Sequence, residues 1–162
     1  MKQIHGLSLG VLIPLIFWAC DVLNDDCPGT KYPPDNRYQV TINQGIWGNV
    51  WFWEGDFQPV CPSGTIRPAV REIYIHKGTT HDSVVYEGQL IVQIKTKLIK
   101  VVISNASGFY QAELDSGAYS LFIKEDSGFY FDGSDSRFLA PGYVQPGMIT
   151  KRQLDITYGA AY

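Results

Sequence analysis

Apolar and polar residues alternate along much of the chain from Gly45 onwards, and this alternation predicts β-strands. In the segment 109–114, Tyr110, Ala112 and Leu114 share one face, and the residues between them are polar. A period of two with polar partners is typical of strands that pack one face on a core and turn the other to water. The same period recurs in the segments 70–77, 119–124 and 153–158. No segment of comparable length has the period of an amphipathic helix.

Short turns connect the predicted strands. The segments 104–108 and 115–117 are polar and contain glycine, which favours tight connections between neighbouring strands. They predict that three consecutive strands form a meander. The segment 97–103 is more apolar on both faces, which indicates a central strand. Together these patterns predict an all-β fold, an antiparallel β-sandwich of about seven strands.

A family resemblance supports this fold class. The stretch SNASGFYQAELDSGAYSLFIKED resembles the motif of carboxypeptidase regulatory-like domains, and GIWGNVWFWEGDFQPV resembles their first strand and turn. The resemblance covers about residues 45–124 and implies a transthyretin-like (prealbumin-like) β-sandwich. It also implies an accessory or surface module, because a fold of this kind does not by itself bring chemistry. The recurrent positions of the motif are Gly108, Tyr110, Leu114, Gly117, Tyr119 and Leu121.

The first residues have the pattern of a lipoprotein signal peptide. Lys2 gives a positive start, the apolar run 7–18 is too short to span a bilayer as a stable helix, and Ala19 precedes Cys20. This resembles the lipobox of bacterial lipoproteins, which implies cleavage before Cys20 and acylation of its thiol, for example with palmitate. Because Trp18 and its neighbour are bulkier than the residues usual there, an ordinary cleaved signal peptide and an uncleaved anchor stay open.

The chain therefore divides into three parts. Residues 1–19 are a signal peptide, 20–44 a flexible tether, and 45–162 the β-sandwich domain. The tether prediction depends on turn signals such as those at 33–36 and on the scarcity of apolar residues. The expected location is the bacterial cell envelope, at the outer membrane, with the periplasmic or surface face left open.

The charge of the chain limits its possible binding partners, and its cysteine content indicates a disulfide. A formal net charge of -3 without a Lys/Arg cluster argues against a nucleic-acid partner.

If Cys20 is acylated, Cys27 and Cys61 remain as a pair in an oxidising compartment. A disulfide between them would close a loop of about 34 residues and stabilise the fold by roughly 3–4 kcal/mol. Two unpaired thiols and a soft metal site are the alternatives, and the metal site is the weaker of these.

Three tryptophans lie on one face of the first predicted strand. Trp47, Trp51 and Trp53 share parity, opposite Ile46 and Val50. If the aliphatic face packs on the core, the indoles lie on the outer face. Rows of exposed aromatic rings stack on sugars or anchor proteins, because indole offers a large area and an N–H donor. The alternative is that a loop or a neighbouring strand covers them.

Motifs for catalysis and metal binding give no support for an enzyme. A GxSxG pattern at 6–10 lies in the signal peptide, and no HExxH or phosphate-loop pattern occurs. The end of the chain lacks the Arg and Ser of the Tyr-Arg-Gly-Ser ending of 5-hydroxyisourate hydrolases, which share the transthyretin-like fold. His76 and His81 fit solvated loop positions. The segment 132–136 fits a surface turn better than a calcium loop, because the downstream bidentate Glu is absent.

The sequence thus predicts a non-enzymatic, lipid-anchored envelope protein that acts as an interaction or structural accessory module. Its expected partners are the membrane, through lipid, and an envelope protein or a glycan; no cofactor and no metal are expected. A carbohydrate-binding module that uses Trp47, Trp51 and Trp53 is the alternative.

Overall fold

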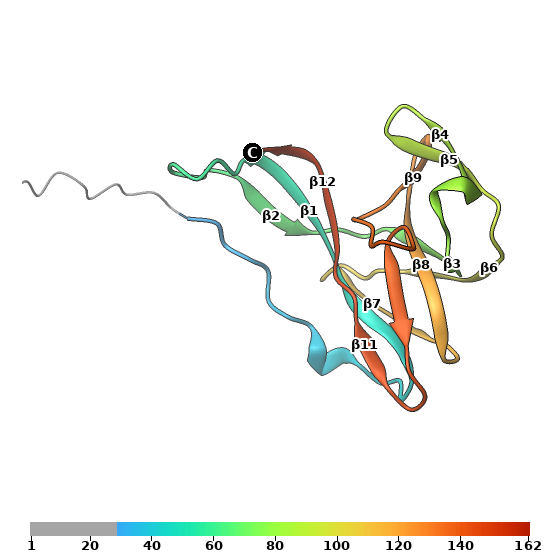
Figure 1. Cartoon of the computed structure of the whole chain (residues 1–162). Helices are drawn as coiled ribbons and strands as arrows, with labels where there is room; N and C mark the ends of the chain where they lie inside the picture. The colour runs from blue at the N-terminus through green and yellow to red at the C-terminus, as the bar shows by residue number, and fades with distance from the viewer. Residues whose placement is uncertain (1–28) are drawn as a thin grey trace, which may run out of the picture.

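The computed structural model describes residues 29–162, and this part of the chain is all-β as predicted (Figure 1). Two short 3-10 helices, η1 (Arg37–Gln39) and η2 (His81–Ser83), are its only helical turns. The strands are β1 (Gly45–Asp56), β2 (Thr65–Pro68), β3 (Glu72–Lys77), β4 (Val84–Glu87), β5 (Leu90–Ile94), β6 (Leu98–Ile103), β7 (Phe109–Glu113), β8 (Gly117–Glu125), β9 (Gly128–Tyr130), β10 (Pro141–Val144), β11 (Ile149–Lys151) and β12 (Leu154–Ala161).

The first sheet is built around β1, which is long enough to pair with two strands on each edge. On one edge its first half pairs with β7 and its second half with β2, both antiparallel. On the other edge β11 and β12 follow one another, and both run parallel to β1. The antiparallel arrangement predicted from the sequence therefore holds for most pairs but not for these two. The parallel pairing is feasible because the whole second sheet lies between β1 and β11 in the chain.

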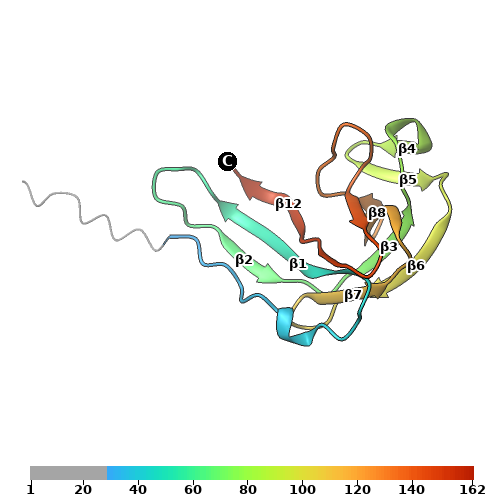
Figure 2. The same ribbon diagram turned by 60° about the horizontal axis from the view of Figure 1, so that its bottom comes forward.

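The second sheet contains seven strands in the order β4-β5-β9-β8-β3-β6, and β10 pairs with the first half of β8. All its ladders are antiparallel. It lies opposite the first sheet, while the ends of β1, β2 and β12 extend beyond it (Figures 1 and 2). The predicted sandwich is confirmed.

Most residues of the core between the sheets are ones that the alternation placed inside; Ala69 and Val144 are two that it did not. Ile46 and Val50 of β1 are fully buried against side chains of the second sheet. Removing aliphatic side chains of this size from water stabilises a fold by about 1.5–3 kcal/mol each. Other core residues are Ile73, Ile75, Tyr110, Ala112, Leu114, Tyr119, Leu121, Ile123, Leu154 and Ile156.

The predicted meander is wrong. β6 pairs with β3 in the second sheet, β7 pairs with β1 in the first, and β8 returns to the second. The two short turns therefore carry the chain from one sheet to the other instead of joining neighbours. Alternation and turn residues are the same for both kinds of connection, so the sequence pattern does not distinguish them.

The expectation that the segment 97–103 is a central strand is also wrong, because β6 lies at the edge of the second sheet. Val102 packs partly against the core, whereas Leu98, Val101 and Ile103 are exposed. One face of β6 therefore packs on the core, and no segment of residues 29–162 covers the apolar side chains of its other face.

Gly48 allows the closest approach in the first sheet. The chain passes from β11 to β12 at Arg152, whose backbone N–H donates to the carbonyl oxygen of Trp47 at 2.8 Å. A Cβ atom at Gly48 would lie 1.8 Å from the Arg152 carbonyl oxygen. Only glycine lets the junction of β11 and β12 reach β1 here.

Several sequence predictions fall outside the described residues. These concern the signal peptide, the acylation of Cys20, Cys27 as a disulfide partner, and the first part of the tether. Within residues 29–162, no helix is long and apolar enough to span a membrane.

Candidate functional site

The tryptophan row lies on the outer face of β1, as its parity predicted. Ile46 and Val50 point into the core, so the three indoles point away from it. They are nevertheless covered: Trp47 and Trp51 are each 6% exposed, and Trp53 is half-buried. Of the two alternatives for this row, exposed indoles or covered indoles, the structure shows the second.

Part of the cover is residues 29–44, which we call the strap; outside it, Phe109 lies against Trp47 and Phe57 against Trp53. The strap is the described part of the predicted tether, and it runs along β1 and β2 before entering β1 (Figure 2). The Tyr32 ring lies 5.9 Å from that of Trp51 and 5.7 Å from that of Trp53, centroid to centroid. Tyr32 itself stays 61% exposed, so it shields the indoles while remaining in contact with solvent.

Asn36 fastens the middle of the strap. Its side-chain N–H₂ donates to Asn49 Oδ1 at 2.7 Å and to the Ser107 carbonyl oxygen at 2.9 Å. Asn36 is the single buried residue of the strap. Buried amides of this kind are tolerated because their polar atoms are paired.

Further side-chain contacts fasten the strap on either side of Asn36. Lys151 Nζ donates to Asp35 Oδ2 at 2.6 Å, and the Thr41 backbone N–H donates to Gln111 Oε1 at 3.0 Å. The hydrogen bond from Lys151 lowers the pKa of Asp35. Both groups of this ion pair are well exposed, so the pair adds little to stability.

Two buried donors beneath the strap have no partner among the described residues. They are Asn49 Nδ2 and Trp51 Nε1, which lie on the same face of β1, two residues apart. By contrast, Trp53 Nε1 donates to Asp155 Oδ1 at 3.0 Å. Each unpaired buried donor lowers the stability of the fold by about 1–3 kcal/mol. The strap therefore covers this face without providing a hydrogen-bond acceptor for either donor.

A hollow of about 630 Å³ opens beside Trp47, between the strap and β11. Lys151 Nζ lies 5.3 Å from the Trp47 ring centroid, within the range of a cation–π contact. Asp35 and Arg37 of the strap line the same hollow. The Trp47 end of the row is therefore the end that a ligand can approach.

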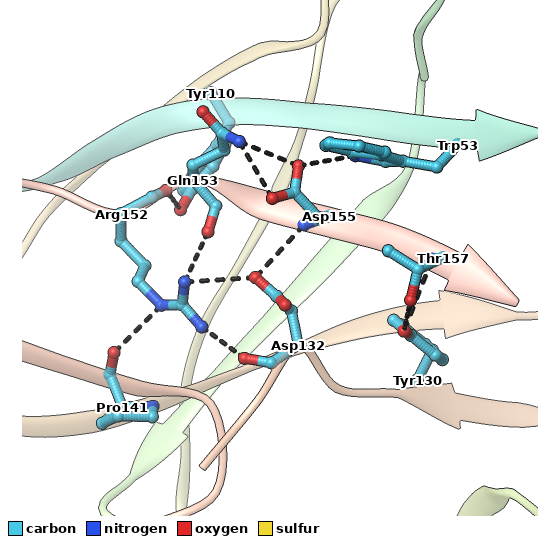
Figure 3. A network of polar contacts seen from close by, with 9 residues as sticks. All are labelled: Trp53, Tyr110, Tyr130, Asp132, Pro141, Arg152, Gln153, Asp155 and Thr157. Carbon is cyan, nitrogen blue, oxygen red and sulfur yellow. Dashed lines mark hydrogen bonds and ion pairs between the residues drawn. The ribbon is translucent and has the colours of Figure 1, made fainter. Parts of the chain in front are cut away.

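A polar network fixes the other end of the row (Figure 3). The Arg152 guanidinium donates to Asp132 Oδ2 and to the carbonyl oxygens of Pro141, Gln153 and Asp132. Burial raises the pKa of Asp132, and the charge of Arg152 opposes this rise. The Asp155 carboxylate accepts hydrogen bonds from Trp53 Nε1 and Gln153 Nε2, and the Asp155 backbone N–H donates to Asp132 Oδ2. The network joins β12 to the segment after β9 and orients Trp53.

The acidic segment 132–136 forms a surface turn. Asp135 Oδ1 accepts the backbone N–H groups of Arg137 and Phe138, and its Oδ2 accepts the Tyr143 hydroxyl at 2.5 Å. With Asp132 committed to Arg152, the carboxylates bind their own chain. Residues 29–162 contain no cluster of three or more side chains able to hold a metal ion.

The two histidines have different surroundings. His81 lies in η2 and is exposed, as expected. The expectation is wrong for His76, which lies in β3 and is buried, with Nδ1 2.9 Å from the Thr96 carbonyl oxygen. His76 lies within the strand that the alternation predicted for the segment 70–77, and it pairs with both β6 and β8, so it is not a loop residue.

Cys61 lies in the loop between β1 and β2, in a left-handed backbone conformation with φ 58°. Because Cys27 is outside the described residues, the disulfide between Cys27 and Cys61 stays a prediction.

A second surface lies along β6, which has β3 as its single ladder partner within residues 29–162. Leu98, Val101 and Ile103 stand opposite His76, Tyr74 and Glu72 and so share the outer face of the sheet. Beside them a hollow of about 650 Å³ is lined by several residues, among them Lys77, Lys97, Lys100, Glu113, Asp115 and Tyr119.

The sequence did not reveal the residues that cover the tryptophan row. Asn36 lies in a Pro-Pro-Asp-Asn stretch, which reads as a turn, and Tyr32 is an isolated aromatic residue. The alternation does show that Asn49 lies between two tryptophans on one face. That polar interruption is the signal from which a partner of this face could have been sought.

No family model matches the chain, and no curated protein or solved structure matches it either. The resemblance to carboxypeptidase regulatory-like domains therefore stays a prediction, and the fold rests on the strands and ladders described above.

Proposed function

We propose that this protein is a non-enzymatic, lipid-anchored accessory module of the bacterial envelope, which binds an envelope protein through the edge of β6. Cys20 carries the lipid in this proposal, and the strap connects it to the central strand of the first sheet. The observation that carries the binding function is the uncovered edge with its exposed aliphatic side chains.

An edge strand offers unpaired backbone N–H and C=O groups to another strand, and natural proteins usually protect such edges. Here Val101 is 40% exposed and Ile103 62% exposed on the same face. A partner strand that pairs with β6 gains backbone hydrogen bonds and covers these side chains, which is the mode of β-strand addition.

The lysines beside β6 indicate the charge of the partner segment. Lys100 lies in β6 and Lys97 directly before it, and both line the same hollow as Lys77. Two acidic residues, Glu113 and Asp115, lie there too, so the cations are in slight excess. We expect an extended apolar segment with acidic flanking residues.

The proposal is tested with a photoreactive amino acid at position 101 of the tagged full-length protein in its host cell. Position 92 is the matched control, because Val92 is 39% exposed and lies on β5, away from the edge. We expect one discrete protein adduct from position 101 that position 92 does not give. The aspartate substitution Ile103→Asp is expected to abolish this adduct. Equal adducts at both positions, or none at position 101, would contradict the proposal.

The carbohydrate-binding alternative is favoured by one observation, the unpaired donors of Asn49 and Trp51. It requires the strap to leave the outer face of β1, because Tyr32 of the strap lies against Trp51 and Trp53.

A further inference from the structure

The strap is attached in a way that permits its removal. It contains no strand, and its hydrogen bonds to the first sheet run through side chains such as Asn36, Gln44 and Gln111. Apart from Asn36, its residues are exposed or half-buried. Its own side chains bury little apolar area, so the free-energy cost of opening lies mainly in exposing the indoles beneath it.

The face beneath it is built differently from the strap. Trp47, Asn49, Trp51 and Trp53 alternate along β1 with the core residues, so their side chains follow one another at about 6.8 Å. Three indole surfaces and an amide in a row make a long, flat and partly polar strip. Two donors of the strip, Asn49 Nδ2 and Trp51 Nε1, are buried without a partner among residues 29–162.

We infer that the strap is a displaceable cover and that the strip Trp47–Asn49–Trp51–Trp53 is a binding site for a glycan chain. A pyranose ring presents C–H groups on its faces and hydroxyl oxygens at its rim. The faces suit the indoles, and the oxygens accept the hydrogen bonds that Trp51 Nε1 and Asn49 Nδ2 lack.

The geometry also indicates where the ligand enters. The hollow beside Trp47 is already open, with Arg37 and Lys151 as donors on its walls. A glycan chain that enters at this hollow extends along β1 as Tyr32 and Asn36 of the strap move away from the strip. This inference deepens the carbohydrate-binding alternative and is independent of the β6 edge.

If the open form is a minor state, the apparent affinity equals the intrinsic affinity reduced by the open fraction. Weakening the strap therefore strengthens glycan binding, whereas weakening an ordinary structural segment does not. Asn36→Ala removes the two hydrogen bonds that Asn36 donates to Asn49 and to the Ser107 carbonyl oxygen. We expect about tenfold tighter binding from this substitution, in line with such a shift in population.

The experiment measures binding of β-1,4-linked hexamers of glucose and of N-acetylglucosamine to the full-length protein in detergent. Calorimetry gives the affinity, and tryptophan fluorescence reports on the strip. Tyr32→Ala is the second opening variant, because it removes a ring that lies against Trp51 and Trp53 and is itself 61% exposed. Asp135→Asn, on the surface turn of another segment, is the matched control and should bind like the unmodified protein.

Trp51→Phe separates binding on the strip from binding elsewhere. It keeps an aromatic ring and removes the unpaired N–H, so it should weaken glycan binding at least severalfold in the Asn36→Ala background. Failure of both opening variants to bind either hexamer, while folded by circular dichroism, would overturn the inference. Binding that is indifferent to Trp51→Phe would overturn it as well. Adducts at position 101 test the β6 proposal separately.

Discussion

At the residue scale, His76 shows how burial changes the chemistry of a side chain. Its ring packs edge-on to Phe122, with a centroid distance of 5.7 Å, and Nδ1 contacts the Thr96 carbonyl oxygen. Burial lowers the pKa of His76, because a cationic imidazole is poorly solvated there. The folded state therefore holds this proton less tightly than the unfolded state does.

The stability of the protein should consequently depend on pH below neutrality. The contribution of the neutral His76 ring is present above the unfolded pKa of about 6.5. It is lost as the pH falls from there through the lowered folded pKa. Urea unfolding between pH 7.5 and 5 should show a decreasing free energy of unfolding, and His76→Gln should flatten that dependence. His81→Gln is the control and should keep it, since His76 is retained; equal slopes for all three proteins would contradict the assignment.

The residues of the candidate site were only partly predictable. Parity placed Trp47, Trp51 and Trp53 on the outer face, because alternation follows from strand geometry alone. Whether that face was covered depends on where a polar segment folds back, and nothing in residues 29–44 has the period of an element. Contacts such as that between Asn36 and Asn49 join positions remote in sequence, so no local pattern announces them.

At the element scale, the connection between β6 and β7 is more important than its length suggests, because it crosses from one sheet to the other. Asn105 Oδ1 accepts hydrogen bonds from the backbone N–H groups of Ser107 and Phe109, at 2.9 and 3.1 Å. Its side-chain N–H₂ donates to Gln39 of the strap. Asx turns of this type replace backbone partners that a crossing connection lacks.

Asn105→Ala should therefore destabilise the protein by about 1–2 kcal/mol, the cost of leaving such groups without their partner. Asn105→Asp keeps the accepting oxygen and loses mainly the contact with Gln39, so its effect should be about 0.5 kcal/mol. Chemical denaturation of both variants gives the comparison. Equal losses for Ala and Asp would mean that the accepting oxygen does not hold the turn.

The strands themselves were predictable where one face is apolar and buried, as in β12. Their pairing was not, since a glycine-containing turn serves a hairpin and a crossing equally well. Strand β6 was misjudged because side chains such as Val101 are apolar without being covered. That disagreement between composition and burial is also the basis of the proposed partner surface on β6.

At the scale of the whole molecule, the first sheet joins the two ends of the described chain. Strand β1 follows the strap, and β12 lies beside β1 in a parallel ladder. A pull on the strap is therefore resisted by a strand paired on both edges. In the proposed lipoprotein, the tether transmits its load to the best-paired strand of the sandwich, and the β6 edge on the other sheet remains accessible.

The anchor is tested by fractionating cells that express the full-length protein, Cys20→Ser or Cys61→Ser. Acylation of Cys20 predicts that the unmodified protein and Cys61→Ser stay with the membranes and incorporate labelled palmitate, whereas Cys20→Ser does neither. Two chains of buried CH₂ groups, at about 0.8 kcal/mol per group, suffice for stable anchoring, and their loss leaves no comparable apolar segment.

The alternatives give different patterns in the same experiment. An ordinary cleaved signal peptide leaves all three proteins in the soluble fraction, and an uncleaved anchor keeps all three in the membrane. Only lipid on Cys20 separates the two serine variants from each other. Because Cys61→Ser also removes one partner of the predicted disulfide, non-reducing electrophoresis of the same samples shows whether Cys27 and Cys61 pair. A disulfide would give the unmodified protein a faster mobility than Cys61→Ser, and the difference should vanish on reduction.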